Sequence, residues 1–143
     1  MRFSNNMFFL SNFAPASIVD PDFGFTYPTV EHAYQAMKSL DSLDRLLVSQ
    51  LATPNRAKQL GKTFKLRQNW DEIKLDVMEQ LLRQKFSPGT HLADLLIATG
   101  SEALIEDNDW KDTYWGVYKG KGENNLGKLL MKIRKELQEG VDK

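Results

Sequence analysis

Helix signals, each with its own start and stop residues, recur along most of this chain and constrain its fold more than any other feature. The segment from Thr53 to Gly61 has an N-cap threonine, a proline at the first helical position and a glycine just past the expected end of the helix. Thr29 offers a second N-cap, and apolar residues at helical spacing follow it through about Lys38. Strand signals are few and short. The pattern predicts a predominantly helical α+β fold with a small sheet, and not a doubly wound α/β fold.

The other predicted elements follow from the same kind of signal. Asn69, with Glu72 three residues on as an approximate capping box, is expected to begin the longest helix, which ends before Ser87-Pro88-Gly89. Further helices are expected over 43–51, over 92–98 and from Leu126 to a stop at Gly140. Short strands or extended segments are expected over 7–13 and 23–27, and strands over 103–106 and 114–117. No repeat or linker divides the chain, so one compact domain over residues 1–143 is expected.

Composition excludes several classes of chemistry. There is no cysteine and there are two histidines, so thiolate nucleophiles, disulfides and multi-histidine metal sites are excluded, and we expect neither a metal nor a cofactor. Nineteen basic residues balance nineteen acidic ones, so a nucleic-acid partner would have to meet a local patch. The first residues lack the apolar core of a signal peptide, and no apolar run approaches the ~20 residues of a membrane span. We therefore expect a cytoplasmic protein with no membrane partner.

One helix carries a stripe of polar residues. Glu31, Gln35 and Lys38 stand at i, i+4 and i+7, so Gln35 and Lys38 lie within about 40° of Glu31 around the helix axis. Such a stripe is most often a solvated face with an ordinary ion pair. The alternative is a functional site, because polar residues also stand next to large apolar ones at Asn12, and next to tryptophan at Trp70 and Trp115. Those tryptophans fit a core position or a pocket that stacks a nucleobase or sugar.

A glycine-rich loop precedes the last helix. Residues 120–125 include two glycines, and lysines 119, 121 and 128 surround them. Backbone N–H groups before a helix favour anions, so phosphate binding is one interpretation of this loop, although the P-loop spacing is absent.

These segments together resemble the NADAR (YbiA-like) family of N-glycosidases. The blocks that carry the resemblance stand in order along nearly the whole chain: FLSNF at 9–13, YPTVEHAYQAMK at 27–38, AKQLGKTFKLRQNW at 57–70, VMEQLLRQKF at 77–86, LLIATG at 95–100, LIEDNDWKDTYWG at 104–116 and GKGENNLGKLLMKIR at 120–134. One departure is that only residues 1–7 precede the first block, where the family often has a longer aromatic strand. This bears on substrate identity more than on catalysis.

The resemblance implies hydrolysis of a base–ribose N-glycosidic bond. The implied substrates are ADP-ribose attached to guanine bases of nucleic acid and phosphoribosylamino-pyrimidine intermediates of riboflavin synthesis. Motif by motif, Glu31 matches the family's catalytic glutamate, Trp70 and Asp112 match the other two motif residues, and Lys38 ends the first block. The resemblance therefore implies that these four residues are catalytic: Glu31, Trp70, Asp112 and Lys38. The remaining residues that fall in pocket-forming motifs or flank them are expected to bind substrate: Asn12, Gln35, Lys58, Arg67, Trp115 and Asn125.

Two chemical routes are open at this point. Glu31 can activate water as general base, with Asp112 orienting the water or the ribose hydroxyls. Alternatively, the Lys38 amine can attack C1′ after ring opening and form a Schiff base. Two rival functions remain: a non-catalytic module that binds ADP-ribose or nucleotides, and a plain interaction domain.

Overall fold

The computed structural model describes residues 3–140, and the chain divides into two compact units. One unit, here called the central unit, is Asn12–Lys85. The other, the terminal unit, combines Met1–Ser11 with Phe86–Lys143. The expectation that residues 1–143 form one domain stays a prediction.

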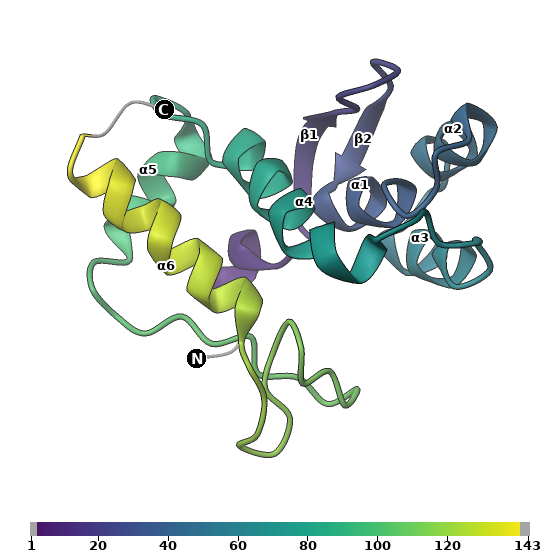
Figure 1. The fold of residues 1–143 in the computed structure, drawn as a ribbon. Coiled ribbons are helices and arrows are strands. Elements are labelled where there is room, and N and C mark those ends of the chain that lie inside the picture. Colours follow the sequence, from purple (N-terminus) through teal and green to yellow (C-terminus); the bar gives the residue numbers. More distant parts are fainter. Residues whose placement is uncertain (1–2, 141–143) are drawn as a thin grey trace. The chain divides into compact units, whose positions relative to one another are not determined.

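The central unit is a β-hairpin followed by four helices, with the first helix in the middle. Its elements are the strands β1 (Pro15–Val19) and β2 (Thr26–Thr29) and the helices α1 (Val30–Ala36), α2 (Ser42–Ser49), α3 (Pro54–Gly61) and α4 (Trp70–Lys85). Helix α1 contacts both strands and the other three helices (Figure 1). A seven-residue helix enclosed on so many sides leaves its polar side chains little access to water, and all seven of its residues are buried.

The hairpin is held by a buried ionic network at its turn. The strands are antiparallel, with Ile18 opposite Tyr27 and both side chains fully buried. The Asp20 carboxylate accepts hydrogen bonds from the Asp22 and Phe23 backbone N–H groups and from the Tyr27 hydroxyl, the last at 2.5 Å. The Arg45 guanidinium of α2 lies 3.3 Å from the same carboxylate. Burial raises the pKa of Asp20, but these hydrogen bonds and the nearby Arg45 charge outweigh it and hold the pKa below its usual value.

The start of α1 is fixed by a threonine and a buried histidine. The Thr29 hydroxyl accepts a hydrogen bond from the His32 backbone N–H at 3.0 Å and lies 2.7 Å from His32 Nδ1. His32 Nε2 lies 3.0 Å from the Leu51 carbonyl oxygen. Because a carbonyl only accepts, Nε2 carries the proton, and a neutral ring then accepts the Thr29 O–H at Nδ1. Burial lowers the pKa of His32, which matches this neutral form.

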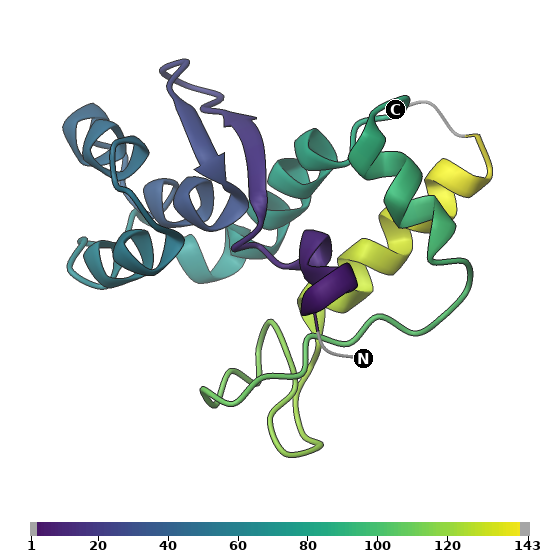
Figure 2. The same cartoon turned by 180° about the vertical axis from the view of Figure 1, so that it is seen from behind.

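The terminal unit contains two packed helices and a long irregular segment. Its elements are the 3₁₀ helix η1 (Asn5–Leu10) and the helices α5 (His91–Ala98) and α6 (Asn125–Gln138). Helix α5 packs against α6, as both views show (Figures 1 and 2). Residues 101–124 connect these helices without forming a named helix or strand.

The prediction of a helical α+β fold with a small sheet is confirmed, whereas four local predictions are wrong. Residues 7–13 do not form a strand, because η1 satisfies its N–H groups locally, for example from Ser11 to Phe8. The segments 103–106 and 114–117 form no named strand, and an isolated bridge joins Asp107, just after the first segment, to Val117. The longest helix begins at Trp70, one residue late, and Asn69 has a left-handed φ of 63° instead of the extended backbone of an N-cap.

Candidate active site

The polar stripe of α1 is enclosed by protein. Glu31 is 8% exposed and Gln35 4%, so the solvated-face interpretation is wrong for both side chains. A buried carboxylate is stable only where partners replace the lost water. Gln35 supplies one such partner: its Nε2 donates to Glu31 Oε2 at 2.6 Å. The short distance is typical of a hydrogen bond to a charged acceptor.

The backbone of Glu31 is fixed as firmly as its side chain. The Glu31 N–H donates to the Asn12 carbonyl oxygen at 3.0 Å, which ties the first turn of α1 to the segment before β1. The Asn12 side chain is buried and its Nδ2 lies 3.6 Å from the Met78 sulfur. Its Oδ1 accepts no hydrogen bond from the described part of the chain. A buried acceptor without a donor costs about 1–3 kcal/mol of folding free energy. Asn12 Oδ1 can therefore accept a hydrogen bond from a bound molecule or water.

Lys38 lies at the far end of the same stripe and is half-buried. Its ammonium is 5.7 Å from the centre of the Tyr34 ring. Burial is the main cause that lowers the pKa of Lys38 below its usual value, and the Glu31 carboxylate opposes that effect. Three neighbouring ammonium groups lower the pKa further: those of Lys58, Lys62 and Lys74. Lysines from α3, its C-cap and α4 therefore act on the end of α1 that carries Lys38.

Trp70 packs against α1 instead of standing open to solvent. Its ring is 5.3 Å from the Tyr34 ring, centre to centre, with the planes inclined by 49°. With only 5% of the residue exposed, the indole has no open face on which a base could stack in this structure. It supports Tyr34, and Tyr34 in turn lies beneath the Lys38 ammonium.

Arg67 lies at the C-terminal end of α1. Its backbone N–H donates to the Lys38 carbonyl oxygen at 2.8 Å, and its Nη1 to the Met37 carbonyl oxygen at 3.4 Å. A cation at this end favours the helix dipole and caps carbonyl groups that have no partner within the helix. Arg67 thus fixes the exit from α1, as Thr29 fixes its entry.

Seven of the ten predicted site residues belong to the central unit: Asn12, Glu31, Gln35, Lys38, Lys58, Arg67 and Trp70. The other three, Asp112, Trp115 and Asn125, belong to the terminal unit. There, Asp112 Oδ1 accepts the backbone N–H groups of Tyr114 and Trp115 at 3.0 and 2.9 Å and so shapes the turn that carries Trp115. The Tyr114 and Trp115 rings pack edge to face, 4.8 Å apart.

The loop before α6 is not an open anion cradle. The backbone N–H groups of residues 123–126 donate to the carbonyl oxygens of residues 113–116 at 2.8 to 3.2 Å. Asn125, for example, donates to Tyr114 at 3.2 Å. The phosphate interpretation of this loop needed those groups to be free, so its physical basis is lost.

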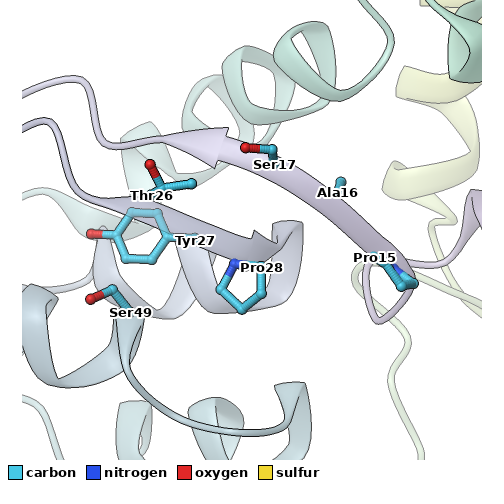
Figure 3. Close-up of a pocket in the computed structure, with 7 residues that line it drawn as sticks. All are labelled: Pro15, Ala16, Ser17, Thr26, Tyr27, Pro28 and Ser49. Carbon is cyan, nitrogen blue, oxygen red and sulfur yellow. The ribbon is translucent and has the colours of Figure 1, made fainter.

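A hollow of about 520 Å³ lies elsewhere on the central unit, against the hairpin. It is lined by both strands and α2 (Figure 3), through Pro15, Ala16, Ser17, Thr26, Tyr27, Pro28 and Ser49. This lining includes no carboxylate, histidine or lysine. The Tyr27 hydroxyl donates to Asp20, and burial together with that contact raises the pKa of Tyr27. The hollow therefore lacks a carboxylate or imidazole that could perform acid–base chemistry near neutral pH.

Two other features bear on the class of site. Within residues 3–140, no three His, Asp or Glu side chains gather in a way that could hold a metal ion. No helix in that range has the length and apolar character needed to cross a membrane. A buried carboxylate held by an amide, with lysines beside it, is an arrangement that general acid–base chemistry can use.

Comparison with known proteins gives the family. The NADAR domain model matches residues 2–138. N-glycosidase YbiA of Escherichia coli (strain K12) is 42% identical over 131 residues, which cover 89% of this chain and 79% of that protein. Riboflavin biosynthesis protein PYRR, chloroplastic, of Zea mays is 38% identical over 143 residues, covering 89% of this chain and 23% of that one.

A solved structure supports the same assignment. The NMR structure of the E. coli protein YbiA matches with a TM-score of 0.83 at 38% identity, covering 98% of this chain and 83% of that chain. The chain belongs to the NADAR domain family.

Sequence reasoning missed several residues that the structure brings to α1. Two of them could have been found from helical spacing. Lys62 is four residues after the predicted Lys58, and Tyr34 is four residues before the predicted Lys38, so each shares a helix face with a predicted residue. Lys74 had no such signal, because only the packing of α4 on α1 brings it near. Gly61 was interpreted as a helix stop, but it is the last residue of α3 and its surroundings give it another role.

Proposed function

We propose that this chain hydrolyses a base–ribose N-glycosidic bond, with Glu31 as the group that activates water. At the level of the family, the chain is a hydrolase that acts on N-glycosyl bonds. One observation carries the residue assignment: the Glu31 carboxylate is buried, and Gln35 holds it at 2.6 Å. A general base needs a fixed position as much as a suitable pKa.

The reaction breaks C1′–N and leaves its electron pair on the base. Positive charge develops on the ribose ring, and the Glu31 carboxylate stabilises it. Water then adds to C1′ and its proton passes to Glu31, while the departing base nitrogen takes a proton from solvent water. Glu31 afterwards returns its proton to solvent, so the net reaction consumes one water molecule. The protein supplies a carboxylate that is held in position before the substrate arrives, so little reorganisation is needed at the transition state.

Other residues of the central unit have roles that follow from their surroundings. The unpartnered Asn12 Oδ1 accepts a ribose hydroxyl. Lys58, Lys62 and Lys74 form a local cationic rim near Lys38 that suits a phosphorylated substrate, although the chain as a whole has no net charge. Trp70 shapes the site through Tyr34 instead of stacking on the base.

The terminal-unit residues enter the proposal through the family motif. Asp112 orients the attacking water or the ribose hydroxyls, and Trp115 and Asn125 contact the substrate. The bonds that Asp112 accepts from the Tyr114 and Trp115 N–H groups give it a second task, that of setting the Trp115 turn.

The physiological substrate is one of the two N-glycosides that the family implies. The similarity to proteins named for riboflavin biosynthesis supports a phosphoribosylamino-pyrimidine. The other class is ADP-ribosyl guanine in nucleic acid. A side-by-side assay of the purified chain on both substrates, with detection of the released base, tests the proposal. Turnover of either supports a glycosidase, whereas binding of both without release of base would leave a non-catalytic nucleotide-binding module.

A further inference from the structure

Gly61 of α3 lies directly against the Gln35 side chain. It is a helical residue without a positive φ, so no conformational demand requires glycine there. Glycine inside a helix is less stable than alanine because its backbone loses more conformational freedom on folding. Glycine is therefore explained by the space around this position, where a side chain would meet a neighbour.

A Cβ at Gly61 would occupy the position of the Gln35 side chain. It would overlap Gln35 Oε1 and would lie 2.8 Å from Gln35 Cδ and 3.0 Å from Gln35 Cβ. Such distances are below ordinary van der Waals contact. The terminal amide can swing away, but Gln35 Cβ is fixed by the backbone of α1. An alanine at this position would thus either displace the amide or push α3 away from α1.

The displaced amide is the one that holds Glu31. A carboxylate only accepts, so the Gln35 nitrogen must face Glu31 and its oxygen must point the other way. That oxygen, Gln35 Oε1, is buried and has no hydrogen-bond donor in the described part of the chain. It lies against the Gly61 backbone instead, where the missing side chain leaves room for it.

We infer that Gly61 is a positioning residue for the reaction. Because it lacks a side chain, it leaves the space in which the Gln35 amide can lie against the Glu31 carboxylate and donate to it. The inference rests on the proposed role of Glu31, and it predicts that a single methyl group on α3 acts on turnover through Gln35. Neither Gly61 nor its helix needs to touch substrate for this effect.

The test combines three variants with a matched control. Gly61→Ala is expected to lower kcat about 10- to 100-fold with KM within about twofold, because small misplacements of a catalytic group have effects of this size. Gln35→Ala is expected to do the same. The double variant should be at most slightly slower than Gln35→Ala alone, since the amide that the methyl displaces is already gone and only the contact with Cβ at 3.0 Å remains. Gln59→Ala, an exposed change on the same helix, should leave both constants unchanged.

Two readouts separate this inference from the proposed function. The Gln35 side-chain NH₂ resonances in ¹⁵N–¹H spectra should shift in Gly61→Ala, as they should in Glu31→Gln, with or without turnover. Unshifted resonances, wild-type kcat in Gly61→Ala, or losses that multiply in the double variant would each overturn the inference. A shift in a protein that releases base from neither substrate would support the seating of Gln35 and refute the glycosidase.

Discussion

Trp70 offers a direct way to separate support of the site from contact with the substrate. Its ring is almost wholly buried against Tyr34. An indole buries roughly 200 Å², and at about 25 cal/mol per Å² this contributes about 5 kcal/mol. Replacement by alanine typically costs about 3–5 kcal/mol because part of the space is refilled. That is a large share of the ~5–15 kcal/mol that stabilises a domain.

Trp70→Phe is therefore the informative change. It keeps most of the buried area, so we expect the free energy of unfolding to fall by about 1–2 kcal/mol, measured by urea denaturation. Because the indole acts through Tyr34 and the Lys38 end of α1, kcat should fall no more than about tenfold. Tyr34→Leu should reproduce that kinetic effect while Trp70 is intact.

The alternative, in which a base stacks on Trp70, gives a different outcome. Trp70→Phe would then raise KM strongly with little loss of stability, since the ring would be a ligand contact and not a packed support. That result would refute the buried, supporting role.

Three further predictions concern charges. Borohydride added during turnover should trap no adduct at Lys38 if water is the nucleophile; a covalent sugar adduct there would replace the Glu31 route with the Schiff-base route. Lys62→Gln should raise KM for a phosphorylated substrate about two- to fivefold without changing kcat, as expected for an exposed charge. The control Lys65→Gln, also at an exposed lysine, should leave KM unchanged. Equal effects of the two changes on KM would refute a local cationic rim. Burial lowers the pKa of His32, so the unfolded state binds more protons than the folded state. The contribution of His32 to stability should be complete above about pH 6.5 and should fall by up to about 1.4 kcal/mol per pH unit as the pH drops below that value. His32→Gln should flatten that slope and the exposed His91→Gln should not; a slope that persists without His32 would contradict its buried neutral form.

The helices were predictable because their signals are local. Thr29 and Thr53 cap α1 and α3 as expected, since a cap is decided by residues only three apart in the chain. The aromatic segment 7–13 failed for the opposite reason: strand character depends on a distant partner, and η1 forms without one. The strand at Pro15–Val19 was missed because its pairing with β2 is equally non-local.

For the site too, local features could be predicted from the sequence and features that depend on packing could not. The stripe of Glu31 and Gln35 follows from helical spacing, but spacing alone favours a solvated face. Only the packing of α1 within the central unit decides that the stripe is buried. The contact of Gln35 with Gly61 could not be predicted, because it depends on how closely two backbones approach. The resemblance to the family supplied the residue roles, whereas spacing and composition did not.

Glu31 carries the account, and its isosteric replacement tests it most directly. In Glu31→Gln, single-turnover release of base should be about 10²- to 10⁴-fold slower, because a general base is lost. The thermal unfolding midpoint should stay within a few degrees, since the side chain keeps its shape and an acceptor for Gln35. Release of base at a near-wild-type rate by this folded variant would contradict the assignment of Glu31.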